Sequence, residues 1–215
     1  MNYQLELEKI LSSLNGERPK LLLHSCCAPC SSYCLEYLRD YFEITVYYYN
    51  PNITEASEYY KRQEEEKRLI QRLNEESEYR IHIVEAPYDP EKFLKMSQGL
   101  ENVPEGGTRC EACFALRLSA TARQAALGGY DYFTTTLSIS PLKNAEKLNE
   151  IGLASAGSSG AKYLVSDFKK KGGYQRSIEL SKKYGLYRQD YCGCIYSRME
   201  RDKRKASEQK KGDIK

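Results

Sequence analysis

The eight cysteines of this chain are the residues whose type and spacing suggest chemistry. They fall into three groups: Cys26, Cys27, Cys30 and Cys34; Cys110 and Cys113; Cys192 and Cys194. A disulfide framework is typical of much smaller secreted domains, whereas clustered cysteines in a reducing compartment more often bind metal or carry out redox chemistry. The grouping therefore favours a metal or redox site.

Two CxxC pairs could supply the ligands of one metal centre. The first lies in Cys26-Cys27-Ala28-Pro29-Cys30, and the second is Cys110-Glu111-Ala112-Cys113. The second pair begins a predicted helix, where backbone N–H groups favour thiolates. Four thiolates suit either a structural zinc ion or a [4Fe–4S] cluster, and the spacing does not distinguish them.

The remaining cysteines have different interpretations. In Cys192-Gly193-Cys194, one intervening residue would make a disulfide ring tight, and strain makes a bridge easier to reduce. The pair suits an electron relay, with further metal ligation as the alternative. Cys34 lies one helical turn beyond Cys30, close to Leu35 and Leu38, and is predicted to be a small packing residue.

Short apolar runs alternate with longer helical patterns along the chain. Strands are predicted near 21–24, 44–49, 81–84, 130–134 and 163–165, and helices near 30–39, 55–77, 90–97, 111–127, 144–155 and 174–184. The helix over 55–77 is the clearest, with a stripe of Tyr60, Leu69, Ile70 and Leu73. The alternation predicts an α/β fold, a single Rossmann-like domain with a parallel sheet flanked by helices.

Ligands of open α/β sheets bind beyond the carboxyl ends of the strands. After the first predicted strand come Ser25, Cys26 and Cys27, so two adjacent cysteines fall where a site is expected. His24 ends that strand and either assists the site or packs beneath it. The segments that follow the other strands are Asn50-Pro51-Asn52, Tyr88-Asp89 and 134–140.

The charge of the chain is unevenly distributed. Residues 1–159 hold 17 Lys and Arg against 23 Asp and Glu, whereas residues 160–215 hold 16 against 7. A basic C-terminal third suggests a polyanionic partner such as RNA or DNA. The inner candidates for such contacts are Lys169, Lys170, Lys171, Arg176 and Arg188, with Tyr174, Tyr184, Tyr187 and Tyr191 as stacking candidates. We expect residues 1–197 to form the domain and residues 198–215 to form a basic, flexible tail.

Several classes of protein are not supported by the sequence. No apolar run approaches the ~20 residues of a membrane span, and the acidic start lacks the features of a signal peptide, which predicts a cytoplasmic protein. The sequence contains no GxGxxG or Walker A motif, so a nicotinamide or nucleoside triphosphate site has no support.

Five segments, in order, resemble one known family. HSCCAPC, YYYNPNI and GGTRCEACFALRL, together with TTTLSISPLKN and DFKKKGGYQRSIELSKKYGLYRQDYCGCIYS, are similar to the non-cobalamin epoxyqueuosine reductase family, QueH. The resemblance covers roughly residues 19–198. It implies an oxidoreductase that reduces epoxyqueuosine to queuosine at the wobble position of tRNA, the last step of queuosine biosynthesis.

The resemblance also implies cofactors and roles for individual cysteines. It places a [4Fe–4S] cluster on Cys26, Cys27, Cys110 and Cys113, and a redox-active disulfide between Cys192 and Cys194. The implied partners are tRNA that bears epoxyqueuosine and an electron donor whose identity the sequence does not reveal.

The chemistry of this reaction sets further requirements. Conversion of an epoxide to an alkene removes one oxygen as water and needs two electrons and two protons. A cluster with four cysteine ligands has no vacant iron for the oxygen unless a ligand leaves, so either a ligand exchange or a second metal site, such as an additional iron, would supply the Lewis acid. Cys30 is the candidate ligand of that second metal, and Asp89 is a weaker one. The required acid is a carboxyl group or a tyrosine that the sequence does not identify.

Two other functions remain as alternatives. A zinc-stabilised RNA-binding module explains the CxxC pairs and the basic tail, but not the Cys192–Cys194 pair. A thiol–disulfide oxidoreductase is less favoured because neither CxxC has a thioredoxin-like context.

Overall fold

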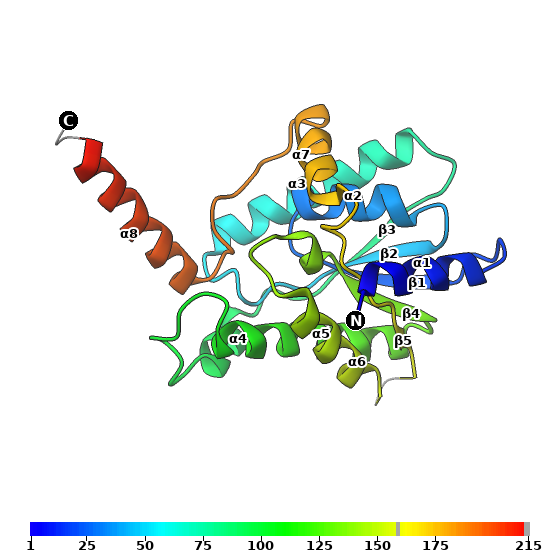
Figure 1. Cartoon of the computed structure of the whole chain (residues 1–215), viewed down its shortest axis with the longest axis horizontal. Coiled ribbons are helices and arrows are strands. Elements are labelled where there is room, and N and C mark those ends of the chain that lie inside the picture. The colour runs from blue at the N-terminus through cyan, green and yellow to red at the C-terminus, as the bar shows by residue number, and fades with distance from the viewer. Residues whose placement is uncertain (158–159, 213–215) are drawn as a thin grey trace.

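Five apolar runs pair into one parallel sheet in the computed structural model, which describes residues 1–157 and 160–212 (Figure 1). The strands are β1 Lys20–Ser25, β2 Glu43–Tyr48, β3 His82–Glu85, β4 Tyr132–Thr135 and β5 Lys162–Tyr163. Their order is β3-β2-β1-β4-β5, so the order reverses at β1, in the middle of the sheet. The predicted Rossmann-like α/β fold is confirmed.

Helices cover both faces of this sheet. They are α1 Tyr3–Ser13, α2 Ala28–Leu38, α3 Ala56–Glu75, α4 Pro90–Met96, α5 Thr108–Leu127, α6 Ala145–Ala156, α7 Gly173–Lys183 and α8 Ile195–Gly212, with a short 3₁₀ helix η1 over Thr136–Ile139. One buried cluster joins α1, α2, α3 and α7 to one face, and a second joins α5 and α6 to the other.

The central strand β1 is buried on both of its faces. Leu21 and Leu23 are fully buried in the first cluster, and Leu22 is fully buried in the second. A strand covered on both faces is a continuous apolar run. Since parallel strands end at the same edge, β1 delivers the residues after Ser25 to the edge where ligands bind.

Three details differ from the sequence-based prediction. Helix α1 was not predicted, although the Asn2 side chain caps it and Leu7 and Leu11 are buried one turn apart. The stripe on α3 contains Tyr59, which is 1% exposed, in place of Tyr60, which is 53% exposed. Strand β5 is shorter than predicted and ends at Tyr163, although the Leu164 N–H still donates to the Phe133 oxygen of β4.

Residues 198–212, within the segment expected to be a flexible tail, continue helix α8, which extends away from the sheet (Figure 1). The beginning of α8 is attached to the domain by ion pairs of Arg198 with Glu55 and of Arg201 with Asp190. The domain boundary at residue 197 and the flexibility of the tail stay predictions. Residues 213–215 of that segment lie outside the described residues.

Glu66 on α3 is a fully buried carboxyl group. Neither of its oxygens has a hydrogen-bond partner within the described part of the chain. Burial raises the pKa of Glu66 from 4.5 to about 8, because the charged form loses its hydration. Between these two values the unfolded chain loses the proton that the folded chain keeps. The free energy of unfolding therefore falls as the pH rises through this window, and the contribution is fully favourable only below 4.5.

We expect Glu66→Gln to remove this pH dependence. Each unit of pKa shift corresponds to about 1.4 kcal/mol, so the variant should gain several kcal/mol over the parent between the two ends of the window. Urea unfolding of both proteins across this pH range measures the difference. Glu64→Gln is the matched control, because Glu64 lies on the same helix with a side chain 70% exposed. Parallel pH curves for parent and Glu66→Gln would contradict the expectation.

Candidate metal and redox site

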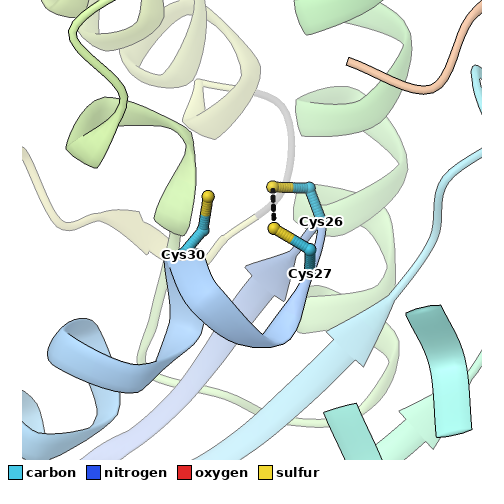
Figure 2. Close-up of side chains that lie close together, drawn as sticks. All are labelled: Cys26, Cys27 and Cys30. Atoms are coloured by element: carbon cyan, nitrogen blue, oxygen red, sulfur yellow. Dashed lines mark hydrogen bonds between the residues drawn. The ribbon is translucent and has the colours of Figure 1, made fainter. Parts of the chain in front are cut away.

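Three cysteines follow β1 directly at the start of α2. Cys27 is the residue before the helix, and Pro29 occupies its first turn, where the fixed φ of proline favours helix initiation. This turn brings the sulfurs of Cys26, Cys27 and Cys30 within 4.8 Å of one another, and Figure 2 shows them facing a common point. The group can bind a metal ion, since thiolates are soft ligands that zinc and iron–sulfur clusters accept.

The three thiols share charge unequally. The Cys26 and Cys27 sulfurs are 3.8 Å apart. Hydrogen bonds from Cys27 and Cys30 hold the pKa of Cys26 well below its usual value. In the same exchange the pKa of Cys27 rises to about 12, and that of Cys30 rises well above its usual value. Negative charge in this group is therefore favoured on Cys26 over Cys27 and Cys30, and a metal would displace the remaining protons.

Cys110 and Cys113 lie on one face of the first two turns of α5, at the spacing that makes helical neighbours. Together with Cys192 and Cys194 they line a cavity of about 100 Å³. Burial raises the pKa of Cys113 to about 12 and that of Cys194 to about 11. All eight cysteines of the chain are free thiols in the structure.

A second cavity of about 360 Å³ adjoins the first. Cys26 and Cys30 line the larger cavity, and Cys192 and Lys143 line both. The predicted site cysteines other than Cys27 thus line two adjoining cavities, and Cys27 is grouped with Cys26 and Cys30. Cys34 lies elsewhere, fully buried in the core, which confirms its predicted position as a packing residue.

The structure does not gather the four predicted cluster ligands into one set. Within residues 1–157 and 160–212, the three sulfurs after β1 form the group with metal-ligand spacing. Cys110 and Cys113 belong to the neighbouring cavity. The ligand set of Cys26, Cys27, Cys110 and Cys113 therefore stays a prediction.

The segment that carries Cys192 and Cys194 is held by α3. Arg62 is 2% exposed and donates hydrogen bonds to the backbone oxygens of Cys192 (3.0 Å) and Tyr191 (3.4 Å). Glu58 accepts a hydrogen bond from Arg62 Nε at 2.7 Å and fixes its direction. A buried, paired guanidinium with several bonds is a rigid support, so the backbone of the dithiol has a fixed position.

Gly193 lies between the two cysteines with φ of +116°, a conformation that favours glycine. Its backbone oxygen accepts a hydrogen bond from the Thr54 N–H. A Cβ at this position would lie 2.9 Å from Ile53 and 3.2 Å from Arg62. Both the conformation and the space therefore require glycine.

Arg117 on α5 is a fully buried cation that lines the larger cavity. It donates hydrogen bonds to Asn50 Oδ1 (2.8 Å) and His24 Nε2 (3.3 Å), neither of which carries a negative charge. Its Nη1 has no hydrogen-bond partner within the described residues. Burial lowers the pKa of Arg117, but the neighbouring sulfurs of Cys113 and Cys26 outweigh burial and raise it.

His24 supports Arg117 and does not face the thiols as a ligand. Burial, followed by the charge of Arg117, lowers the pKa of His24 to about 3, so the ring is neutral. Its Nδ1 is 2.8 Å from Thr135 Oγ1. His24 therefore packs in the core and orients the Arg117 side chain.

The surroundings of the thiols fit a negatively charged group with sulfur ligands. Gln189 Nε2 donates to Cys27 Sγ at 2.8 Å, and Lys143 borders both cavities. A buried cation such as Arg117 is costly unless an anion is close. The Nη1 of Arg117, which has no hydrogen-bond partner among the described residues, and the cysteine thiols both suit such a negatively charged group.

Arg62, Arg117, Lys143 and Gln189 are not among the residues predicted from the sequence. One signal was available, because Cys110, Cys113 and Arg117 follow the three- and four-residue spacing of one helix face. Lys143 and Gln189 lie in loops and meet the thiols only through the fold.

Comparison with known proteins decides the family. The family model described as epoxyqueuosine reductase QueH matches residues 21–200. The chain belongs to this family. Its relatives include proteins named epoxyqueuosine reductase QueH from Staphylococcus epidermidis, 47% identical over 93% of this chain and 86% of the relative, and from Streptococcus pyogenes, 42% identical over 92% and 78%. A relative of the same name from Thermotoga maritima is 35% identical over 86% of this chain and 94% of its own length.

The name of the QueH family is that of an oxidoreductase, as the resemblance of the five segments implied. In the part of the chain that the structure describes, no helix combines the length and the apolar composition needed to traverse a bilayer.

Proposed function

We propose that this chain is an epoxyqueuosine reductase that removes the epoxide oxygen of epoxyqueuosine at the wobble position of tRNA and yields queuosine. The match of the family model over residues 21–200 carries the proposal. The gathering of six motif cysteines around two adjoining cavities, with Cys27 beside Cys26 and Cys30, supports it. A cytoplasmic location and a tRNA partner are part of the same proposal.

The dithiol of Cys192 and Cys194 has the stoichiometry that the reaction needs. Both C–O bonds of the epoxide break, an alkene forms, and the oxygen leaves as water. This consumes two electrons and two protons, and oxidation of two thiols to one disulfide releases two of each. An external donor of reducing equivalents then restores the dithiol. The backbone contact of Arg62 holds Cys192 at the wall of both cavities, and Cys194 lines the smaller one.

Cys26, Cys27, Cys110 and Cys113 would hold a [4Fe–4S] cluster, which supplies electrons one at a time when it is bound. Arg117 and Lys143 provide positive charge beside this group, and Gln189 donates a hydrogen bond to Cys27. Cys30 is left over from this ligand set and lines the larger cavity. We assign it to an additional iron that would act as a Lewis acid.

The direct test is conversion of the substrate. The anaerobically reconstituted chain is mixed with a chemical reductant and with tRNA that contains epoxyqueuosine, and the digested nucleosides are analysed by mass spectrometry. We expect a product with the mass of queuosine, one oxygen lighter than the substrate. A fully loaded protein that leaves the epoxide intact would refute the proposed function.

Cys30 and Cys34 form a matched pair for the second metal. Both lie on α2, but Cys30 lines the larger cavity and Cys34 is buried in the core. We expect Cys30→Ala to keep most of the cluster absorbance and to lose turnover. Cys34→Ala should keep both. Visible absorption and the conversion assay measure the two properties, and equal cluster loss in both variants would show that the ligand set is wrong.

A further inference from the structure

The basic side chains that are candidates for RNA contact differ in whether they are already paired with a carboxylate. Lys169 pairs with Asp167 at 2.7 Å, Lys171 with Glu8 at 2.5 Å, and Arg176 with Glu36 at 2.8 Å. An ammonium or guanidinium already held by a carboxylate is a weaker ligand for phosphate. Arg188 is different, since its Nη1 donates to the neutral Ser181 hydroxyl at 3.0 Å and its side chain lines the larger cavity.

The tyrosines of the same region differ in whether their rings are buried or covered by other groups. Tyr184 is buried and its hydroxyl donates to Glu76 at 2.7 Å. The Tyr187 ring is covered by the Lys61 ammonium, 3.6 Å from its centroid. The Tyr191 ring lies against the guanidinium groups of Arg62 and Arg201. Tyr174 is 37% exposed and lines the larger cavity, and no ring or cation contact covers it among the described residues.

Lys143 completes this group. It lines the larger cavity with Tyr174 and Arg188, and it has no carboxylate partner within residues 1–157 and 160–212. Burial lowers the pKa of Lys143, but the neighbouring sulfurs of Cys192, Cys26 and Cys30 outweigh burial and raise it. An aromatic ring and two cations free of carboxylates therefore border the cavity that leads to the thiols.

The backbone fixes Tyr174 in this place. Gly172 takes a left-handed conformation and Gly173 begins α7. A Cβ on Gly173 would lie 2.0 Å from the Phe168 oxygen and 2.5 Å from the Tyr33 ring. The start of α7 is thus packed tightly against its neighbours, and the ring that follows is presented by a rigid element.

We propose that Tyr174, Arg188 and Lys143 form a nucleotide-binding rim. The Tyr174 ring stacks on the base of a single unstacked nucleotide of an RNA loop, and Arg188 and Lys143 bind its flanking phosphates. Bases in single-stranded loops are recognised by stacking on aromatic rings, and enzymes that act on a base take it out of its stack. A cavity of about 360 Å³ is in the range of sites for small ligands. The inference rests on the proposed function and names the residues that receive its substrate.

The test uses binding of an unmodified anticodon stem–loop RNA with guanosine at the wobble position, measured by fluorescence anisotropy with the reconstituted protein. We expect Tyr174→Ala to weaken affinity about tenfold, since stacking on one base contributes roughly 1–3 kcal/mol and tenfold is 1.4 kcal/mol. Tyr174→Phe keeps the ring and should bind as the parent does. Tyr60→Ala is the control, because Tyr60 is 53% exposed and lies outside the cavity.

The cations are tested through salt dependence. Lys143→Gln and Arg188→Gln should each reduce the slope of log affinity against log salt by about 0.7, the effect of one lost phosphate contact. Lys182→Gln removes the same charge from an exposed position at the end of α7 and should leave the slope unchanged.

These outcomes separate the rim from the reductase activity, because the RNA probe carries no epoxide. If Tyr174→Ala binds like Tyr60→Ala, or if both glutamine variants keep the parent slope, the rim is refuted even when the parent converts epoxyqueuosine. If the variants behave as expected but the loaded parent converts nothing, the rim stands and the proposed reaction fails.

Discussion

Replacement of any one of Cys26, Cys27, Cys110 or Cys113 by alanine is expected to abolish the iron–sulfur cluster of the reconstituted chain. Four thiolates complete the coordination of a [4Fe–4S] cluster, so the loss of one leaves an iron exposed to exchange. In the parent the cluster should account for about four iron and four sulfide per chain, and the additional iron proposed at Cys30 would raise the iron alone. Anaerobic visible absorption and iron and sulfide assays measure the loss.

Cys34→Ala is the matched control, because it removes a buried thiol that faces the core. The structure also gives this experiment a sharp alternative outcome. Cys30 is grouped with Cys26 and Cys27, whereas Cys110 lies on the neighbouring cavity. Loss of the cluster in Cys30→Ala but not in Cys110→Ala would replace the proposed ligand set. Stoichiometric zinc in an active protein would exclude the cluster altogether.

Cys192→Ser and Cys194→Ser are expected to retain the cluster and to stop under multiple turnover. Each variant lacks one of the two thiols whose oxidation balances the reaction. Stability should barely change, because a bridge across one residue restricts the unfolded chain only slightly. Substrate conversion at low enzyme concentration, together with cluster absorbance and thermal unfolding, measures all three properties.

Gly193→Val tests the same segment without removing a thiol. The added side chain meets Ile53 and disfavours the conformation at φ of +116°, so turnover should slow while the cluster remains. Mass spectrometry of alkylated parent protein should find the pair alternating between dithiol and disulfide during turnover. A serine variant that works at the parent rate would refute the relay, and cluster loss would make these thiols iron ligands.

The sequence predicted the sheet well because its central strands are buried on both faces. Leu21, Leu22 and Leu23 form a continuous apolar run in β1. A strand that is buried on both faces has such a run, which can be recognised without tertiary information. Helix α1 was overlooked because only Leu7 and Leu11 of its short stripe are buried alongside Gln4, and Leu5 is exposed. Tyr59 and Tyr60 are adjacent, so an error of one residue in the predicted buried face of α3 puts Tyr60 in the place of Tyr59.

The site was predictable only in its cysteines. Cysteine is rare and its spacing is informative, whereas Arg62 and Arg117 occur in helices in which most of the other charged side chains are not buried. Nothing local distinguishes Arg62, which is 2% exposed, from its neighbours, and for Arg117 the one local signal is the helix face that it shares with Cys110 and Cys113. Their burial results from segments distant in sequence, Tyr191 and Cys192 for Arg62 and Asn50 for Arg117.

The strand order affects how this chain folds while the ribosome synthesises it. β1 pairs with β4, so residues 21–24 wait for residues 132–135 before both edges of the central strand are satisfied. Chains emerge N-terminus first, and an apolar strand with an open edge is a template for aggregation. Cys26 and Cys27, just beyond that strand, stay accessible to oxidants over the same interval. We expect slower elongation before residue 132 to lower the yield of soluble protein, and more so in aerated than in anaerobic cells.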